Sequence, residues 1–385
     1  MNKWTYGLAA VGLVTLGSVA QAEEKAVPLT TALSQTILSG YVDVGANYTI
    51  GSGNNNPVPV SFNGVSKQDG FNVNVVNLTL EKPLDENNWS AGYKAELLFG
   101  PDAVAYNTSI NSAPFNDFSI KQAYVALRAP IGNGLDLKVG SFDTIVGYES
   151  FVGYRNPNIT RSYGYTIEPT EHTGVLASYQ ICDAVGISAG IANTLAPFIN
   201  NRNFSANSES RKTYMASVTL TAPESFGALA GSALYAGIVD GFNGNAKDDQ
   251  TSYYIGGTLA TPVTGLKIGA SYDQVSSGGS GLGGYASALA LYASFQATEK
   301  LSLHSRAEYA KGAIGNSFAA GGTYGKIFAL TGTIQYDLWQ NVISRLEVRW
   351  DHSASGADEF GGRGPGTAPT KKNSIGLYAN LVYVF

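Results

Sequence analysis

Few side chains in this sequence are suited to covalent catalysis or metal binding. The histidines are His172, His304 and His352, and the single cysteine is Cys182. Ser302, two residues from His304, makes the nearest pairing of a nucleophile with a base, and the histidines are too scattered for a metal site. We therefore expect no catalytic residue, no metal and no cofactor, and we interpret Cys182 as an incidental thiol in a turn.

Charged side chains instead recur at every second position of several segments. Arg345, Glu347 and Arg349 alternate with leucine and valine, and Arg306 and Glu308 follow the same pattern. Alternate side chains of a strand point to opposite faces, so each segment has one charged and one apolar face. A charge that faces lipid at mid-bilayer costs about 2–4 kcal/mol, so these five residues are candidates for the inner wall of a water-filled barrel.

Period-two alternation between turn residues predicts sixteen strands of the length that a tilted strand needs to cross a bilayer. They are 39–50, 71–82, 90–99, 118–129, 134–142, 171–181, 185–193, 212–221, 228–239, 251–260, 265–275, 285–297, 301–311, 325–337, 342–352 and 374–385. In 118–129, Lys121 and Arg128 have opposite parity, which predicts either a bulge or an arginine at the strand end. The expected fold class is all-β: a transmembrane, antiparallel, up-and-down β-barrel of about sixteen strands.

The connections between these strands alternate between short turns and longer segments rich in Gly, Asn and Ser. Bacterial outer-membrane barrels have this asymmetry, with short periplasmic turns and long extracellular loops. The composition agrees, because only 14% of residues are charged and the mean hydropathy is −0.03. A barrel wall needs only every second residue to be apolar, whereas a helical membrane protein would be far more apolar.

The two ends of the sequence carry targeting signals. Residues 1–22 combine Lys3, an apolar run and a small-residue site that ends at Ala22, which is typical of a secretory signal peptide cleaved near Ala22. Residues 23–38 would then form a short periplasmic N-terminal segment before a barrel at 39–385. The last strand ends in Phe385, which resembles the signal that the barrel assembly machinery reads. We therefore expect a bacterial outer-membrane location, with lipid and that machinery as partners.

The stretch Gly140–Ser150, followed by Asn156-Pro157 and Thr173-Gly174-Val175, resembles the central signature of the β-barrel porin-2 (OmpL-like) family. The resemblance extends over the whole chain after the signal peptide, although its specific residues are few. It implies a barrel with a channel role. It implies no catalytic residues.

The longest connection, 143–170, is the third external one and is a candidate constriction loop, because the third loop of general porins folds into the lumen. Its charged residues, the candidates for the pore constriction, are Asp143, Glu149, Arg155, Arg161 and Glu168. We hypothesise that it forms an eyelet opposite the arginines of the inner wall, where facing charges would filter solutes by size and charge. The alternative is a solvated surface loop with no such role.

These patterns predict an outer-membrane porin, a water-filled channel for passive diffusion of ions and small hydrophilic solutes, and not an enzyme. Two alternatives stay open: an outer-membrane barrel enzyme such as a lipid hydrolase, and an adhesin or receptor that acts through its loops. A homotrimer is compatible with sixteen strands. The net charge of −5 argues against nucleic acid as a partner.

Overall fold

The computed structural model describes residues 35–385 except 52, 54–66, 68, 86–88, 107–116, 194, 196–198, 200–210, 244–247, 278–283, 313–324 and 364–366. The predicted signal peptide and most of the segment 23–38 lie outside the described residues. Among the residues that are described, no helix is long and apolar enough to cross a membrane.

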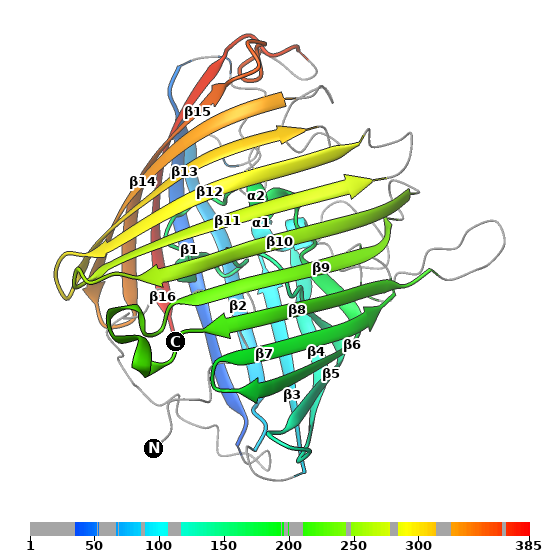
Figure 1. Ribbon diagram of the computed structural model, residues 1–385. Helices are drawn as coiled ribbons and strands as arrows, with labels where there is room; N and C mark the ends of the chain where they lie inside the picture. The colour runs from blue at the N-terminus through cyan, green and yellow to red at the C-terminus, as the bar shows by residue number, and fades with distance from the viewer. Residues whose placement is uncertain are drawn as a thin grey trace.

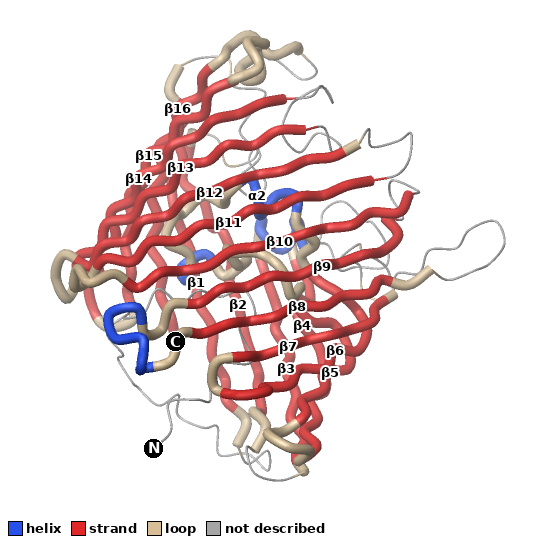
Figure 2. Tube along the Cα trace, viewed as in Figure 1, coloured by secondary structure: helices blue, strands red, loops and turns tan. Residues whose placement is uncertain are grey.

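The chain forms one closed antiparallel barrel of sixteen strands, in which each strand pairs with its neighbours in sequence and β1 pairs with β16 (Figures 1 and 2). The strands are β1 Ile37–Thr49, β2 Gly70–Lys82, β3 Ser90–Phe99, β4 Phe118–Ala129, β5 Leu135–Asp143, β6 Glu171–Cys182, β7 Val185–Ala192, β8 Thr213–Thr221, β9 Ala233–Asn243, β10 Asp248–Ala260, β11 Leu266–Ser277, β12 Tyr285–Gln296, β13 Leu301–Gly312, β14 Gly325–Trp339, β15 Val342–Ser353 and β16 Asn373–Val384. The predicted fold class is confirmed. Two backbone hydrogen bonds between Gly40 and Phe385, of 2.8 and 3.0 Å, join the last residue to β1 at the closing seam.

Short helical elements interrupt the connections. They are α1 Pro101–Tyr106, α2 Tyr163–Ile167, and the 3₁₀ turns η1 Gly153–Arg155 and η2 Glu224–Leu229. The turn η2 explains the one large error in the predicted strands, which placed strand nine at 228–239 instead of Ala233–Asn243. Gly227 and Gly231 in this connection have φ of 58° and 79°, a backbone conformation that ends pairing and that glycine adopts without strain.

The two faces of the wall differ as the alternation predicts. On β15, Arg345 and Glu347 are 2% and 3% exposed, whereas Leu346 and Val348 are 63% and 51% exposed on the outer side. The charged side chains therefore point into the barrel and the apolar side chains point outward, where a bilayer would cover them.

The parity conflict in β4 arises from a β-bulge. Glu96 of β3 pairs with Gln122 and Leu97 pairs with Ile120, so Lys121 is the extra residue. A bulge can turn two successive side chains to the same face. Lys121 and Gln122 both reach Glu96, at 3.4 and 2.8 Å, on the inner side of the wall.

Candidate functional site

The connection between β5 and β6, residues 144–170, folds into the barrel. Its helix α2 lies inside the ring of strands in Figures 1 and 2 and contacts β11, β12 and β13. Most of its side chains are buried, although the connection has no regular sheet pairing of its own. It is therefore held by the wall of the lumen, and we call residues 144–170 the internal loop.

Apolar side chains hold the first part of the internal loop. Ile145, Val146 and Tyr148 are buried in a cluster with side chains of β6, β8, β9, β10 and β12. The ring of Tyr148 stacks on Tyr292 with centroids 4.0 Å apart. Burying such side chains in the lumen removes apolar area from water, which favours a docked loop over a solvated one.

The middle of the internal loop runs along β15, one contact after another. Arg345 donates to the carbonyl groups of Gly153 and Asn156. Glu347 accepts hydrogen bonds from the backbone N–H groups of Ile159 and Thr160. Farther along the strand, Arg349 donates to the carbonyl of Arg161, and Asp351 accepts from the hydroxyl of Tyr163. The polar groups of an irregular backbone segment are costly when buried unless they are paired. The alternating charges of β15 supply these partners.

A buried ion-pair network fastens the same part of the loop to β13. Arg306 lies 2.7 Å from Glu149 of the loop and 2.7 Å from Glu308 of its own strand. Glu308 is also 3.2 Å from Arg349 and accepts a 2.7 Å hydrogen bond from the backbone N–H of Tyr163. The side chains of Arg306 and Glu149 are 0% exposed, so water screens this attraction very little.

The end of the internal loop packs on small residues. The hydroxyl of Ser162 caps α2 by accepting a hydrogen bond from the backbone N–H of Tyr165, at 3.2 Å. Tyr163 and Ile167 of α2 are buried in a cluster with Val275, Phe360 and alanines of β12, β13 and β14. Alanine at these inward positions leaves room for a helix inside the barrel.

The predicted site residues do not share one environment. Glu149 and Arg161 are buried between loop and wall, and so are the wall residues Arg306, Glu308, Arg345, Glu347 and Arg349. The loop is thus bonded to the arginines of β13 and β15 and does not stand opposite them across an opening. Asp143 ends β5 and lies 2.6 Å from Lys121, whereas Arg155 is exposed.

The wall has a second charged region, on β3, β4 and β5, whose residues are not among the predicted site residues. Lys121 lies between Asp143 and Glu96, and Lys94 is 3.7 Å from Glu96. Lys138 lies over the ring of Tyr124, 4.9 Å from its centroid. Alternation in 90–99 and 134–142 was the available signal, but the bulge at Lys121 hides how these charges combine.

A further loop residue, Glu168, lies beside another acid. Burial, the neighbouring carboxyl group of Asp273 on β11 and the more distant Glu149 raise the pKa of Glu168 well above its usual value. Two carboxyl groups in contact cannot both ionise without a compensating cation. Glu168 is therefore protonated in the folded protein at a pH where the unfolded chain would ionise it.

This shift predicts that docking of the internal loop weakens as the pH rises. Above about 4.3, the usual pKa of glutamate, the unfolded or undocked carboxyl loses its proton while the docked one keeps it. The protonated Glu168 therefore stabilises the docked loop fully below about pH 4.3, and this stabilisation declines as the pH rises to the raised pKa. Glu168→Gln, which stays neutral, should make trypsin cleavage at Arg155 and Arg161 slower than in the wild type at pH 8, with little difference at pH 5.

The exposed Glu299 provides the control for that experiment. Glu299→Gln makes the same substitution outside the lumen and should leave the pH profile of cleavage as in the wild type. Identical profiles for Glu168→Gln and the wild type would contradict the assignment.

His304 and Ser302 do not form the hydrogen bond that a catalytic pair would need. His304 is hydrogen-bonded to Ser294 at 2.8 Å, and Ser302 donates instead to Gln296 at 2.8 Å. His172 contacts Thr144 at 3.0 Å. Within the described part of the chain, no three His, Cys, Asp or Glu side chains gather as a metal site.

Solved structures of outer-membrane proteins have the same fold. An anion-selective porin from Comamonas acidovorans matches with a TM-score of 0.62 and 13% identity over 91% of this chain and 99% of that one. The outer membrane channel DcaP of Acinetobacter baumannii gives 0.57 and 15% identity over 91% and 97%. The trimer form of OmpT from Vibrio cholerae gives 0.55 and 13% identity over 91% and 99%. At these identities the likeness establishes the fold alone.

No curated protein sequence matches the chain. A family model does, over residues 35–385, which spans every strand of the barrel. The chain belongs to the family described as "Putative beta-barrel porin-2, OmpL-like".

Proposed function

We propose that the protein is a porin of the bacterial outer membrane, a water-filled channel for passive diffusion of ions and small hydrophilic solutes. The observation that carries the proposal is the closed sixteen-strand barrel with a charged inner face and an apolar outer face. A barrel of this size encloses more space than wall side chains alone can fill. Family membership supports the same role and the outer-membrane location.

The internal loop is the proposed constriction of this channel. It occupies the lumen beside β6–β15, so the remaining passage would run past the charges of β3–β5. Arg155 of the loop is exposed and lies over the ring of Tyr154, 5.7 Å from its centroid. Arg155 and Asp143 are thus the proposed charges at the opening, whereas Glu149 and Arg161 hold the loop in place.

Further features of the proposal concern export and assembly. Cleavage near Ala22 would release the chain into the periplasm, and Phe385 would present the final strand to the barrel assembly machinery. A homotrimer is supported by the trimer form of OmpT among the structures of the same fold. Channel function without catalysis is favoured over lipid hydrolysis, because the recorded hydrogen bonds of His304 and Ser302 go to Ser294 and Gln296 and not to each other.

Adjacent residues of β5 provide the test of a water-filled lumen. Lys138 faces the inside, whereas Val139 is 44% exposed on the outside. In a Cys182→Ser background, Lys138→Cys should form open channels in planar bilayers whose conductance falls when a charged, membrane-impermeant methanethiosulfonate reagent is added. The physical reason is that the reagent adds bulk and charge inside the aqueous path.

Val139→Cys in the same background is the matched control, since a lipid-covered thiol should not react. Absence of channels in all variants would remove the porin function and leave the barrel fold. Equal responses at positions 138 and 139 would contradict the assignment of the two faces.

A further inference from the structure

Arg345 differs from the other buried arginines of the same wall. Arg306 and Arg349 each lie within 3.2 Å of two carboxylate side chains. Arg345 is only 2% exposed, yet within the described part of the chain it forms no ion pair: Nε donates to Asn380 and Nη1 to the carbonyl groups of Gly153 and Asn156. Its Nη2 has no hydrogen-bond partner among the described residues. A buried guanidinium is costly unless a counter-ion compensates it.

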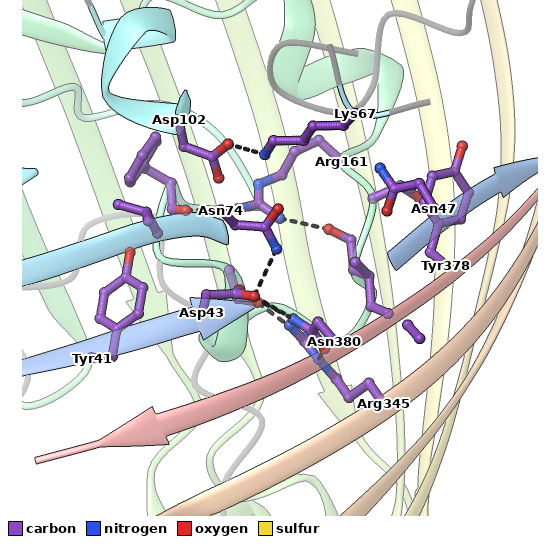
Figure 3. Close-up of a pocket in the computed structure, with 16 residues that line it drawn as sticks. Tyr41, Asp43, Asn47, Lys67, Asn74, Asp102, Arg161, Arg345, Tyr378 and Asn380 are labelled. Atoms are coloured by element: carbon purple, nitrogen blue, oxygen red, sulfur yellow. Dashed lines mark hydrogen bonds and ion pairs between the residues drawn. The ribbon is translucent and has the colours of Figure 1, made fainter. Parts of the chain in front are cut away.

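A small cavity lies beside this guanidinium, between the internal loop and the wall formed by β1, β2, β15 and β16 (Figure 3). Its volume is about 50 Å³, and its charged lining consists of Arg345, Arg161, Lys67, Asp43 and Asp102. Since about 10–15 Å³ of such space holds one water molecule, the cavity has room for one small ion or one carboxylate group together with water.

Among the described residues, the cavity is lined by three basic and two acidic side chains. Lys67 and Asp102 form an ion pair with each other. Asp43 accepts hydrogen bonds from Asn74 at 2.8 Å and from Asn380 at 3.1 Å, so its oxygens are already paired with amides. One bound monovalent anion would add a negative charge beside Arg345 and supply the missing partner of its Nη2.

We propose that this cavity binds a small monovalent anion, either chloride or the carboxylate group of a solute. The proposal deepens the proposed channel function, because the site lies in the lumen where an entering anion would meet it. The bound anion would also have a structural effect. Arg161 and Arg345 donate to carbonyl groups of loop residues 151–159, so an anion that compensates their charge would help to hold this part of the loop against the wall.

Gly153 offers a way to fill the cavity without removing either arginine. A Cβ at this position would lie 3.3 Å from Arg161 Nη2 and 3.6 Å from Asp43 Oδ2, and Gly153 is not among the glycines with positive φ. Alanine can therefore adopt the same backbone, and its methyl group would occupy the space between Asp43 and Arg161. Gly332→Ala on β14 is the matched control, since a Cβ there has no atom of the protein within 4 Å.

Chloride binding to the refolded, detergent-solubilised protein can be measured by the broadening of the ³⁵Cl NMR line. We expect the wild type and Gly332→Ala to broaden the line and Gly153→Ala to lose this broadening. Sodium formate is then added to the wild type. If formate displaces chloride and the line becomes narrow again, the site also binds carboxylates. If the line stays broad, the site binds chloride and not carboxylates. Equal broadening by the wild type and Gly153→Ala, or none by the wild type, would overturn the proposal.

Unheated gel electrophoresis, in which a folded barrel migrates faster than the unfolded chain, checks that Gly153→Ala folds. If Gly153→Ala does not fold, an anomalous diffraction map of wild-type crystals grown in bromide tests the proposal instead. A bromide peak beside Arg345 Nη2 supports the anion site, and the absence of this peak overturns the proposal. Neither measurement needs ion conduction. A failure of the anion site and a failure of the channel function are therefore separate results.

Discussion

Replacing Arg306 with alanine should lower the free energy of unfolding by about 3–5 kcal/mol, the usual cost of removing one partner from a buried ion pair. The guanidinium lies 2.7 Å from both Glu149 and Glu308 and also donates to the carbonyl groups of Thr160 and Arg161. Without this guanidinium, Glu149 loses its ion pair with Arg306 inside the barrel, whereas Glu308 still forms an ion pair with Arg349. Urea titrations of protein folded in lipid vesicles, followed by tryptophan fluorescence, measure the change.

The exposed ion pair of Arg211 and Asp249 is the matched control, because its side chains are 49% and 72% exposed. Arg211→Ala should cost less than about 1 kcal/mol, since water screens the pair. Combining Arg306→Ala with Glu149→Gln should cost less than the two single changes added together, because the second change removes a charge that has lost its partner. Equal effects of Arg306→Ala and Arg211→Ala would show that the internal loop is not anchored by this network.

Deleting residues 151–165 should raise the single-channel conductance by about twofold or more, because this segment fills part of the cross-section of the barrel. The wall should tolerate the deletion. Arg306, Glu308, Arg349 and Asp351 remain linked by ion pairs among themselves, and they balance one another in charge. Planar-bilayer recordings of the purified variant measure the conductance directly.

A deletion outside the lumen separates this effect from a general change in the barrel. Residues 225–228 belong to η2, an exposed turn that joins β8 to β9. Their removal shortens the chain without opening the lumen and should leave the conductance unchanged. If the deletion of 151–165 also leaves conductance and ion selectivity unchanged, the internal loop is not the constriction.

The amino-acid sequence determined the wall of this protein. Fifteen of the sixteen predicted strands lie within about three residues of the observed ones, because a side chain facing lipid must be apolar and one facing the lumen need not be. This requirement acts at every second residue and can be read locally. Even the bulge at Lys121 leaves a local signal, since it reverses the parity of the charges within β4.

The partners of the charges could not be derived in the same way. Glu149 and Arg306 are 157 positions apart, and Thr160 and Glu347 are 187 apart. In the sequence, the alternating arginines and acids of β15 indicate only an inner face. These residues could line an open channel or bind a loop inside the barrel. The alternation in the sequence would be the same in both cases, so it does not distinguish them.

The tertiary structure decided between these cases through the closure of the sheet. Once β1 pairs with β16, the inner faces of all the strands surround one space, and a loop that enters it must find partners for its own backbone. The alanines of β12–β14 leave room there, and the charges of β13 and β15 provide the hydrogen bonds. Which residues face inward is therefore a local property of the sequence, because the period of a strand sets it. Which inward residues are covered by the loop depends on the curvature and register of the whole barrel, which no single segment contains.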